Sequence, residues 1–185
     1  MTVRHRVEAR RFGLVSDTHD DRVDWAQALG KIRAAFGQVD AVIHCGDLCT
    51  PQAIVTLGEI APVWAVRNPH TDPAPAPPML VDGPRVLEAG GTEIGIVFSL
   101  SAEPVLAETD PVLRFSALGA ETACRTLFGG RIDVCVYGGT HKAQVASAAG
   151  ILFVNPGSPT LAKARSVAVL TVSAGSAEVE IRPVG

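Results

Sequence analysis

The sequence lacks an excess of positive charge and any long hydrophobic run. Its 185 residues carry 16 lysines and arginines against 19 aspartates and glutamates, for a formal net charge of −3. Domains that grip phosphate backbones are usually clearly basic, so the charge balance argues against a nucleic-acid partner. No apolar run reaches the length needed to span a bilayer, so we also expect no membrane partner.

Cys-x-x-Cys pairs, a common metal-binding and redox motif, are absent as well. None of the four cysteines belongs to a Cys-x-x-Cys pair, and Cys45 and Cys135 lie inside apolar runs where a thiol acts as a small hydrophobe. A reduced, cytoplasmic protein is the default expectation. The segment 1–11 holds four arginines, but no signal-peptide core with a cleavage site follows it. We therefore expect a flexible N-terminal tail.

The remaining composition is that of one globular domain, expected over 1–185, with 47% hydrophobic and 19% charged residues. In the first half, apolar runs rich in β-branched residues alternate with helical patterns, which predicts parallel strands joined by right-handed crossovers. The expected strands cover 12–16, 39–45 and 63–66. The expected helices cover 24–36, with Asp24 as N-cap, and 50–60, with Thr50 as N-cap and Pro51 at the first helical position.

The second half begins with a proline-rich stretch, 68–84, which predicts a long loop because neither a helix nor a central strand accommodates these prolines. A Gly90-Gly91 hairpin should join strands 85–89 and 92–99. A helix over 116–127 and strands over 132–137, 144–148, 151–155, 166–172 and 177–183 complete the pattern. Together the elements predict two packed mixed sheets with outer helices, a four-layer α/β/β/α sandwich.

Four polar residues follow the ends of expected strands. Asp17 and His19 come after the first apolar run, Asp47 after the second, and His141 after the run that ends at Tyr137. Ligands bind at the carboxyl ends of strands in open α/β sheets, because the loops converge there. Two carboxylates and two imidazoles at such a place suit a divalent metal of the manganese, iron or zinc kind.

In this order, the motifs resemble those of the calcineurin-like metallophosphoesterases, specifically the small bacterial phosphodiesterase branch. The family pattern runs Asp-x-His, Gly-Asp, Gly-Asn-(His/Cys)-Asp, His-Gly-His and Gly-His-x-His, followed by the Asn155-Pro156-Gly157-Ser158 tail. The resemblance extends from about Phe12 to Pro183. It implies the metallophosphoesterase fold, which the retromer subunit of this superfamily shares, and a hydrolase that acts on small phosphate esters.

The resemblance also implies which residues would hold metal. The first ion of the family would be bound by Asp17, His19, Asp47 and His141, which are all present. The second ion would lose two imidazoles, since Gly139 replaces the first histidine of Gly-His-x-His and the segment 97–102 contains no histidine. We therefore expect one ion rather than two, or an empty site, with manganese favoured and zinc or iron as further candidates.

The segment around Asn68 leaves two alignments open. With a one-residue insertion, Asn68 takes the place of the family's asparagine ligand. Without it, Pro69 stands there and His70 occupies the place of the general acid that protonates the leaving group. Both alignments remain possible at this point, so His70 is the candidate catalytic residue and Asn68 a candidate ligand.

Three further residues are expected to support the metal site. His44 lies on the strand before Gly46 and Asp47, and we expect it to be buried and hydrogen-bonded rather than a ligand. Asn155 and Ser158 should shape a turn near the metal loops and support His141. Cys49 also lies close to Asp47, but a thiolate is disfavoured in a carboxylate-based site.

Two functions are compatible with this pattern. The first is a metal-dependent phosphoesterase with a reduced site and weak activity. The second is a catalytically silent protein of the same fold that acts as a binding or scaffold module for a protein partner, as the retromer subunit does. The sequence names no particular substrate.

Overall fold

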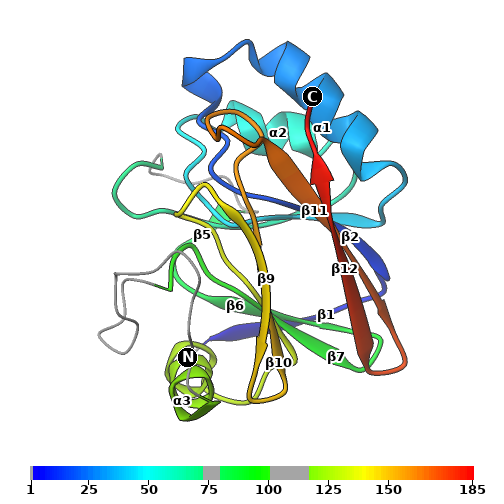
Figure 1. Ribbon diagram of the computed structural model, residues 1–185, viewed down its shortest axis with the longest axis vertical. Coiled ribbons are helices and arrows are strands. Elements are labelled where there is room, and N and C mark those ends of the chain that lie inside the picture. The colour runs from blue at the N-terminus through cyan, green and yellow to red at the C-terminus, as the bar shows by residue number, and fades with distance from the viewer. Residues whose placement is uncertain (1, 73–79, 101–116) are drawn as a thin grey trace.

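Two six-stranded sheets pack face to face, with helices on both outer faces (Figure 1). The computed structural model describes residues 2–72, 80–100 and 117–185. Helices α1 (Trp25–Phe36) and α2 (Gln52–Leu57) cover one sheet, and α3 (Ala117–Phe128) covers the other. The predicted α/β/β/α sandwich is confirmed.

The first sheet carries the parallel strands that the sequence predicts. Strands β2, β3, β4 and β5 run parallel, and β11 and β12 extend the sheet antiparallel beyond β2. In spatial order the strands are β12 (Ser176–Pro183), β11 (Ser166–Ser173), β2 (Arg11–Val15), β3 (Ala41–His44), β4 (Val63–Val66) and β5 (Leu80–Val81).

The second sheet is mixed. Strands β6 and β7 form the hairpin expected at Gly90-Gly91, and β8 pairs parallel with both β7 and β10. In spatial order the strands are β1 (Val3–Val7), β6 (Arg85–Ala89), β7 (Thr92–Ile96), β8 (Val134–Val136), β10 (Ile151–Pro156) and β9 (Ala143–Ala148).

Three apolar clusters separate the four layers. The central cluster lies between the sheets and includes Phe12, Leu87 and Val136. A second lies between the first sheet and α1 and α2, and a third between the other sheet and α3. Residues buried on both faces explain why the central strands read as continuous apolar runs rather than alternating ones.

Helix α1 follows its sequence signals closely. The Asp24 carboxylate accepts a hydrogen bond from the Gln27 N–H (3.1 Å), and Gly37 ends the helix with φ 63°. The helix buries Ile32 and Phe36 against the sheet. A Cβ on Gly13 would stand 2.8 Å from the Phe36 ring, so the close approach of helix and strand needs glycine there.

Other elements differ from the predictions at their ends. The second helix is shorter than expected: α2 ends at Leu57 and turns follow it, although the Thr50 hydroxyl does accept from the Gln52 N–H (3.2 Å). A short strand, β5, lies within the expected proline loop, at an edge of its sheet where proline neighbours are tolerated. Residues 73–79 of that loop, and the predicted helix start at Ser116, lie outside the described residues.

The expected flexible tail over 1–11 is wrong. Strand β1 pairs parallel with β6 in register from Val3↔Arg85 to Val7↔Ala89. The His5 ring packs against Trp64 at 5.0 Å between centroids, and Arg85 lies over the same indole at 4.9 Å. The arginine-rich sequence did not indicate a strand, because an edge strand half exposed to solvent needs few apolar residues.

Across the three described stretches, no helix is long and apolar enough to cross a membrane.

Candidate metal centre

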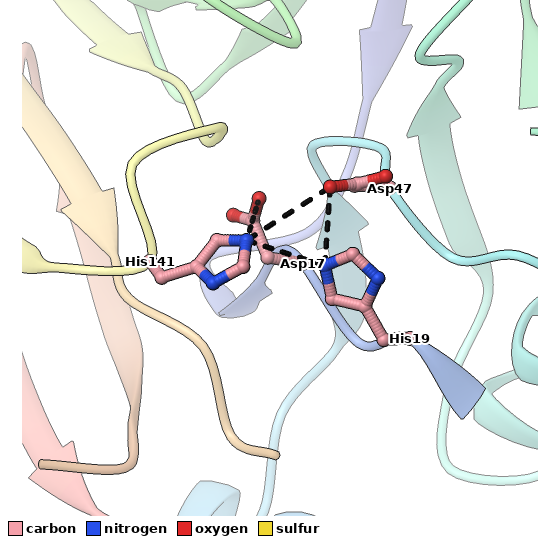
Figure 2. A group of neighbouring side chains, drawn as sticks. All are labelled: Asp17, His19, Asp47 and His141. Atoms are coloured by element: carbon pink, nitrogen blue, oxygen red, sulfur yellow. Dashed lines mark hydrogen bonds and ion pairs between the residues drawn. The ribbon is translucent and has the colours of Figure 1, made fainter. Parts of the chain in front are cut away.

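Asp17, His19, Asp47 and His141 point toward one another where the two sheets meet (Figure 2). The Nε2 atoms of the two histidines are 3.2 Å apart. His19 Nε2 lies 3.1 Å from Asp47 Oδ2, and His141 Nε2 lies 3.4 Å from Asp17 Oδ1. One donor atom from each residue lies within 4.8 Å of the other three. The structure thus brings together the four residues singled out in the sequence.

Adjacent strand ends bring three of these residues together. Asp17 and His19 follow β2, Asp47 follows the neighbouring parallel strand β3, and the two loops continue the backbone pairing beyond the strands. The N–H of Asp17 donates to the Gly46 carbonyl (2.9 Å), and the N–H of His19 donates to the Asp47 carbonyl (3.2 Å). His141 arrives from the other sheet, in the loop between β8 and β9.

The backbone of all four residues is strained. Asp17, His19, Asp47 and His141 have φ between 40° and 63°, the left-handed region that side chains disfavour. Each such residue costs on the order of 1 kcal/mol relative to ordinary backbone. Strained backbone at four neighbouring positions is more typical of a functional site than of residues that only pack the core.

The arrangement fits a divalent ion. Two ligand atoms of one tetrahedral ion, each about 2.1 Å from it, stand roughly 3.4 Å apart. The distances among the donor atoms of the two histidines and two aspartates, 3.1, 3.2, 3.4 and 3.9 Å, are close to that edge length. Two nitrogen and two oxygen donors suit manganese, iron or zinc.

The electrostatics also favour a cation. Asp17 is fully buried, and burial raises its pKa to about 6, although the Gly139 N–H donates to both carboxylate oxygens (3.1 and 3.0 Å) and stabilises the charge. Burial likewise lowers the pKa of His19, which favours the neutral imidazole that metals bind. A bound cation would relieve the cost of burying the aspartate charge.

The second oxygen of Asp47 faces a different group of residues. Asp47 Oδ1 accepts from the Thr71 hydroxyl (2.6 Å) and from Asn68 Nδ2 (3.2 Å), while Oδ2 faces the histidines. Asn68 is buried, and its Oδ1 accepts from the His70 N–H (3.0 Å). The structure therefore brings Asn68, and not Pro69, to the carboxylate, with the amide placed as a donor.

Asp72 organises this loop, and the sequence reading missed it. Its Oδ2 accepts from the N–H groups of Asp47 (2.9 Å) and Asn68 (2.8 Å), and its Oδ1 accepts from the N–H of Leu48 (2.8 Å). One carboxylate thus links the loop after β3 to the loop after β4. The only signal in the sequence was an aspartate four residues after Asn68, within the segment for which two alignments were left open.

His44 is buried and hydrogen-bonded, as expected. Its Nδ1 accepts from the Gly46 N–H (3.0 Å), so the proton is on Nε2, which contacts the Thr18 hydroxyl (3.1 Å). Burial lowers the pKa of His44 to about 4, and the imidazole is neutral. The ring joins the loops that present Asp17 and Asp47 and does not reach the four-residue cluster.

Asn155 and Ser158 support the cluster from the other sheet. Asn155 Nδ2 donates to the Gly138 carbonyl (3.2 Å) and to the Thr140 hydroxyl (3.1 Å), which braces the loop that carries His141. The Ser158 hydroxyl donates to the Asp17 carbonyl (2.8 Å), so it supports Asp17 rather than His141.

The side where a second ion would lie holds no imidazole among the described residues. Gly139 has φ 80°, and Ser99 and Phe98 stand 3.4 and 3.5 Å from where its Cβ would be. The His70 side chain is exposed. Residues 101 and 102 of the segment 97–102 lie outside the described residues. Cys49 Sγ contacts His19 Nδ1 (3.4 Å), and burial raises the pKa of this thiol to about 12, so it is protonated at neutral pH.

Comparisons with known proteins agree with the fold and identify the family. Residues 11–175 match the model of the calcineurin-like phosphoesterase superfamily domain, and the chain belongs to this superfamily. A probable metallophosphoesterase of Methanocaldococcus jannaschii is 29% identical over 165 residues, 88% of this chain and 74% of that protein.

Two solved structures share the fold. Vps29 of Entamoeba histolytica has a TM-score of 0.67 at 20% identity, over 95% of this chain and 99% of that one. A structure described as a novel archaeal phosphodiesterase has a TM-score of 0.64 at 19% identity, over 92% and 99%. The resemblance to the calcineurin-like phosphoesterase superfamily is confirmed.

Proposed function

We propose that this protein is a phosphoesterase that works with a single divalent ion held by Asp17, His19, Asp47 and His141. The observation that carries the proposal is the convergence of four donor atoms within 4.8 Å at the strand ends. Membership of the superfamily supports a phosphate ester as substrate. Manganese is the favoured ion because oxygen and imidazole donors are mixed, and zinc or iron also suit them.

The one-ion proposal rests on the two missing imidazoles and on Asp47. Bridging of two ions with one carboxylate oxygen on each would need Oδ1, but here Thr71 and Asn68 already donate to it. Only Oδ2 faces the histidines. A bound ion supplies a polarised phosphoryl oxygen and a water of lowered pKa. The protein keeps Asp17 oriented through the Gly139 N–H and keeps both imidazoles directed at one point.

The first test measures metal content and turnover together. Protein purified without chelator should contain close to one ion per chain, and should hydrolyse bis(p-nitrophenyl) phosphate when Mn²⁺ is added. Asp47→Asn should abolish turnover, whereas Glu178→Gln, an exposed carboxylate on β12, should leave it unchanged. Turnover that survives Asp47→Asn would refute the assignment of the site, and two ions per chain would refute the one-ion proposal.

His70 is the proposed proton donor to the leaving group. Its imidazole is exposed. The backbone N–H of His70 donates to Asn68 Oδ1, and Asn68 Nδ2 donates to Asp47 Oδ1. A general acid matters most for poor leaving groups, because nitrophenolate leaves without help. His70→Gln should therefore slow hydrolysis of an alkyl phosphate ester far more than that of a nitrophenyl ester. Equal effects on both substrates would argue against this role.

The alternative is a silent binding module, and one observation favours it. The positions expected to hold two further imidazoles carry Gly139 and the Phe98–Ser99 segment, which offer no strong metal ligand. The similarity in fold to Vps29 is compatible with a protein partner. Full metal occupancy without turnover of any phosphate ester, together with a stable complex with another protein, would favour this alternative.

A further inference from the structure

A cavity of about 460 Å³ is lined in part by Phe98 and Ser99, in the segment where the mid-chain histidine of the second ion is missing. Its volume falls in the range of sites that bind small organic molecules, about 300–1,000 Å³. The wall is formed largely by apolar side chains and by proline rings, namely Pro69, Pro84, Val97, Phe98 and Leu127, together with Ser99.

Phe98 and Ser99 line the cavity and also lie against two glycines beside the metal centre. A Cβ on Gly46 would lie 2.9 Å from the Phe98 ring, and Gly46 immediately precedes Asp47. A Cβ on Gly139 would lie 3.4 Å from the Ser99 Cβ, and the N–H of Gly139 binds the Asp17 carboxylate. The same two residues thus line the cavity and contact the loops that carry Asp47 and His141.

The charges in the cavity wall compensate each other. Arg67 and Asp82 are the charged residues among those that line it, and Arg67 Nε lies 2.8 Å from Asp82 Oδ1. This pair leaves no net charge to attract a second phosphate or an ammonium group. A phenyl ring, two prolines and aliphatic side chains instead match the flat faces of an uncharged aromatic ring.

We propose that this cavity binds the aromatic ring of a phosphate ester whose phosphate lies at the metal centre. The protein would then prefer aryl or heteroaryl phosphate esters over alkyl ones. This proposal rests on the proposed function for the position of the phosphate. The loss of two imidazoles would accordingly have opened this side of the site to an organic group.

The test measures binding without turnover, so that a failure of catalysis does not obscure it. Mn²⁺-loaded protein is titrated with phenylphosphonate and with methylphosphonate, and their affinities are compared by calorimetry. We expect phenylphosphonate to bind at least about tenfold tighter, the scale at which an apolar pocket discriminates between groups. Leu127→Trp, which places an indole at the cavity wall, should reduce this preference to within about twofold.

Thr126→Trp provides the matched control, because Thr126 is the exposed neighbour of Leu127 on α3. This variant should keep the full preference for phenylphosphonate. If Leu127→Trp lowers the thermal midpoint or the metal content, Ser99→Leu provides a second way to fill the cavity. Equal affinities in the unmodified protein, binding of neither phosphonate, or a preference that survives both filling variants would overturn the proposal. Absence of turnover alone would count against the proposed function only.

Discussion

Replacing Asp72 by asparagine should strongly destabilise the protein. The Asp72 carboxylate is buried, and its two oxygens accept from three backbone N–H groups at 2.8–2.9 Å. These donors belong to the loops after β3 and β4. An amide at position 72 has only one accepting oxygen, so its NH₂ group must face at least one buried N–H.

The size of the effect follows from these bonds. The orientation that loses least keeps the bonds to Asp47 and Asn68 and gives up the bond from the Leu48 N–H. A hydrogen bond to a charged group contributes about 1.5–3 kcal/mol, and an unsatisfied buried donor costs a similar amount. We therefore expect Asp72→Asn to lower the free energy of unfolding by about 2–4 kcal/mol.

Urea unfolding of metal-free protein measures this loss, with Glu59→Gln as the matched control. Glu59 is exposed, and its Oε2 lies 3.8 Å from the Arg33 guanidinium. Exposed ion pairs contribute little, so Glu59→Gln should change the free energy of unfolding by less than about 0.5 kcal/mol. Asp72→Asn should also weaken Mn²⁺ binding, since Asp72 positions the backbone of Asp47. A loss no larger than that of the control would refute the assignment of Asp72 as the organiser of these loops.

Three further outcomes are expected. Ala174 has φ 46° in the two-residue turn Ala174-Gly175, a backbone conformation that asparagine tolerates better than alanine. Ala174→Asn should therefore raise the free energy of unfolding, measured in urea, by about 0.5–1 kcal/mol. A decrease would contradict the turn geometry. Burial raises the pKa of Asp17 to about 6, above an unfolded value of about 3.9, so its charge makes the metal-free protein less stable as pH rises from about 4 to 6. Asp17→Asn should therefore gain stability over the unmodified protein across that range, and a constant difference between the two would show that the charge is not costly. Mn²⁺ at about 100 times its dissociation constant should stabilise the protein by about 2.7 kcal/mol, seen as a rise of the thermal midpoint. His141→Ala should lose this rise, whereas Lys142→Ala, at the neighbouring exposed position, should keep it.

Local patterns were sufficient for most of the fold. The apolar run before Asp17 is β2, and the periodicity after Asp24 is α1, because propensity, capping and burial agree there. Agreement failed for the N-terminal segment, where four arginines suggested a solvated tail. Strand β1 forms there because β6 provides a pairing partner. The composition of a strand does not specify its partner, which depends on the tertiary structure.

For the site, the residue types and their place after strands were enough to select Asp17, His19, Asp47 and His141. Their convergence follows from the parallel order of β2 and β3 and from the meeting of the two sheets, and strand order is a property of the whole chain. The sequence left open whether Asn68 or Pro69 faces Asp47. The structure brings Asn68 there because Asp72 binds the backbone of both loops. The sequence by itself therefore determined which side chains could bind a metal. Only the tertiary structure decided which carboxylate oxygens face the histidines, because hydrogen bonds between distant loops orient them.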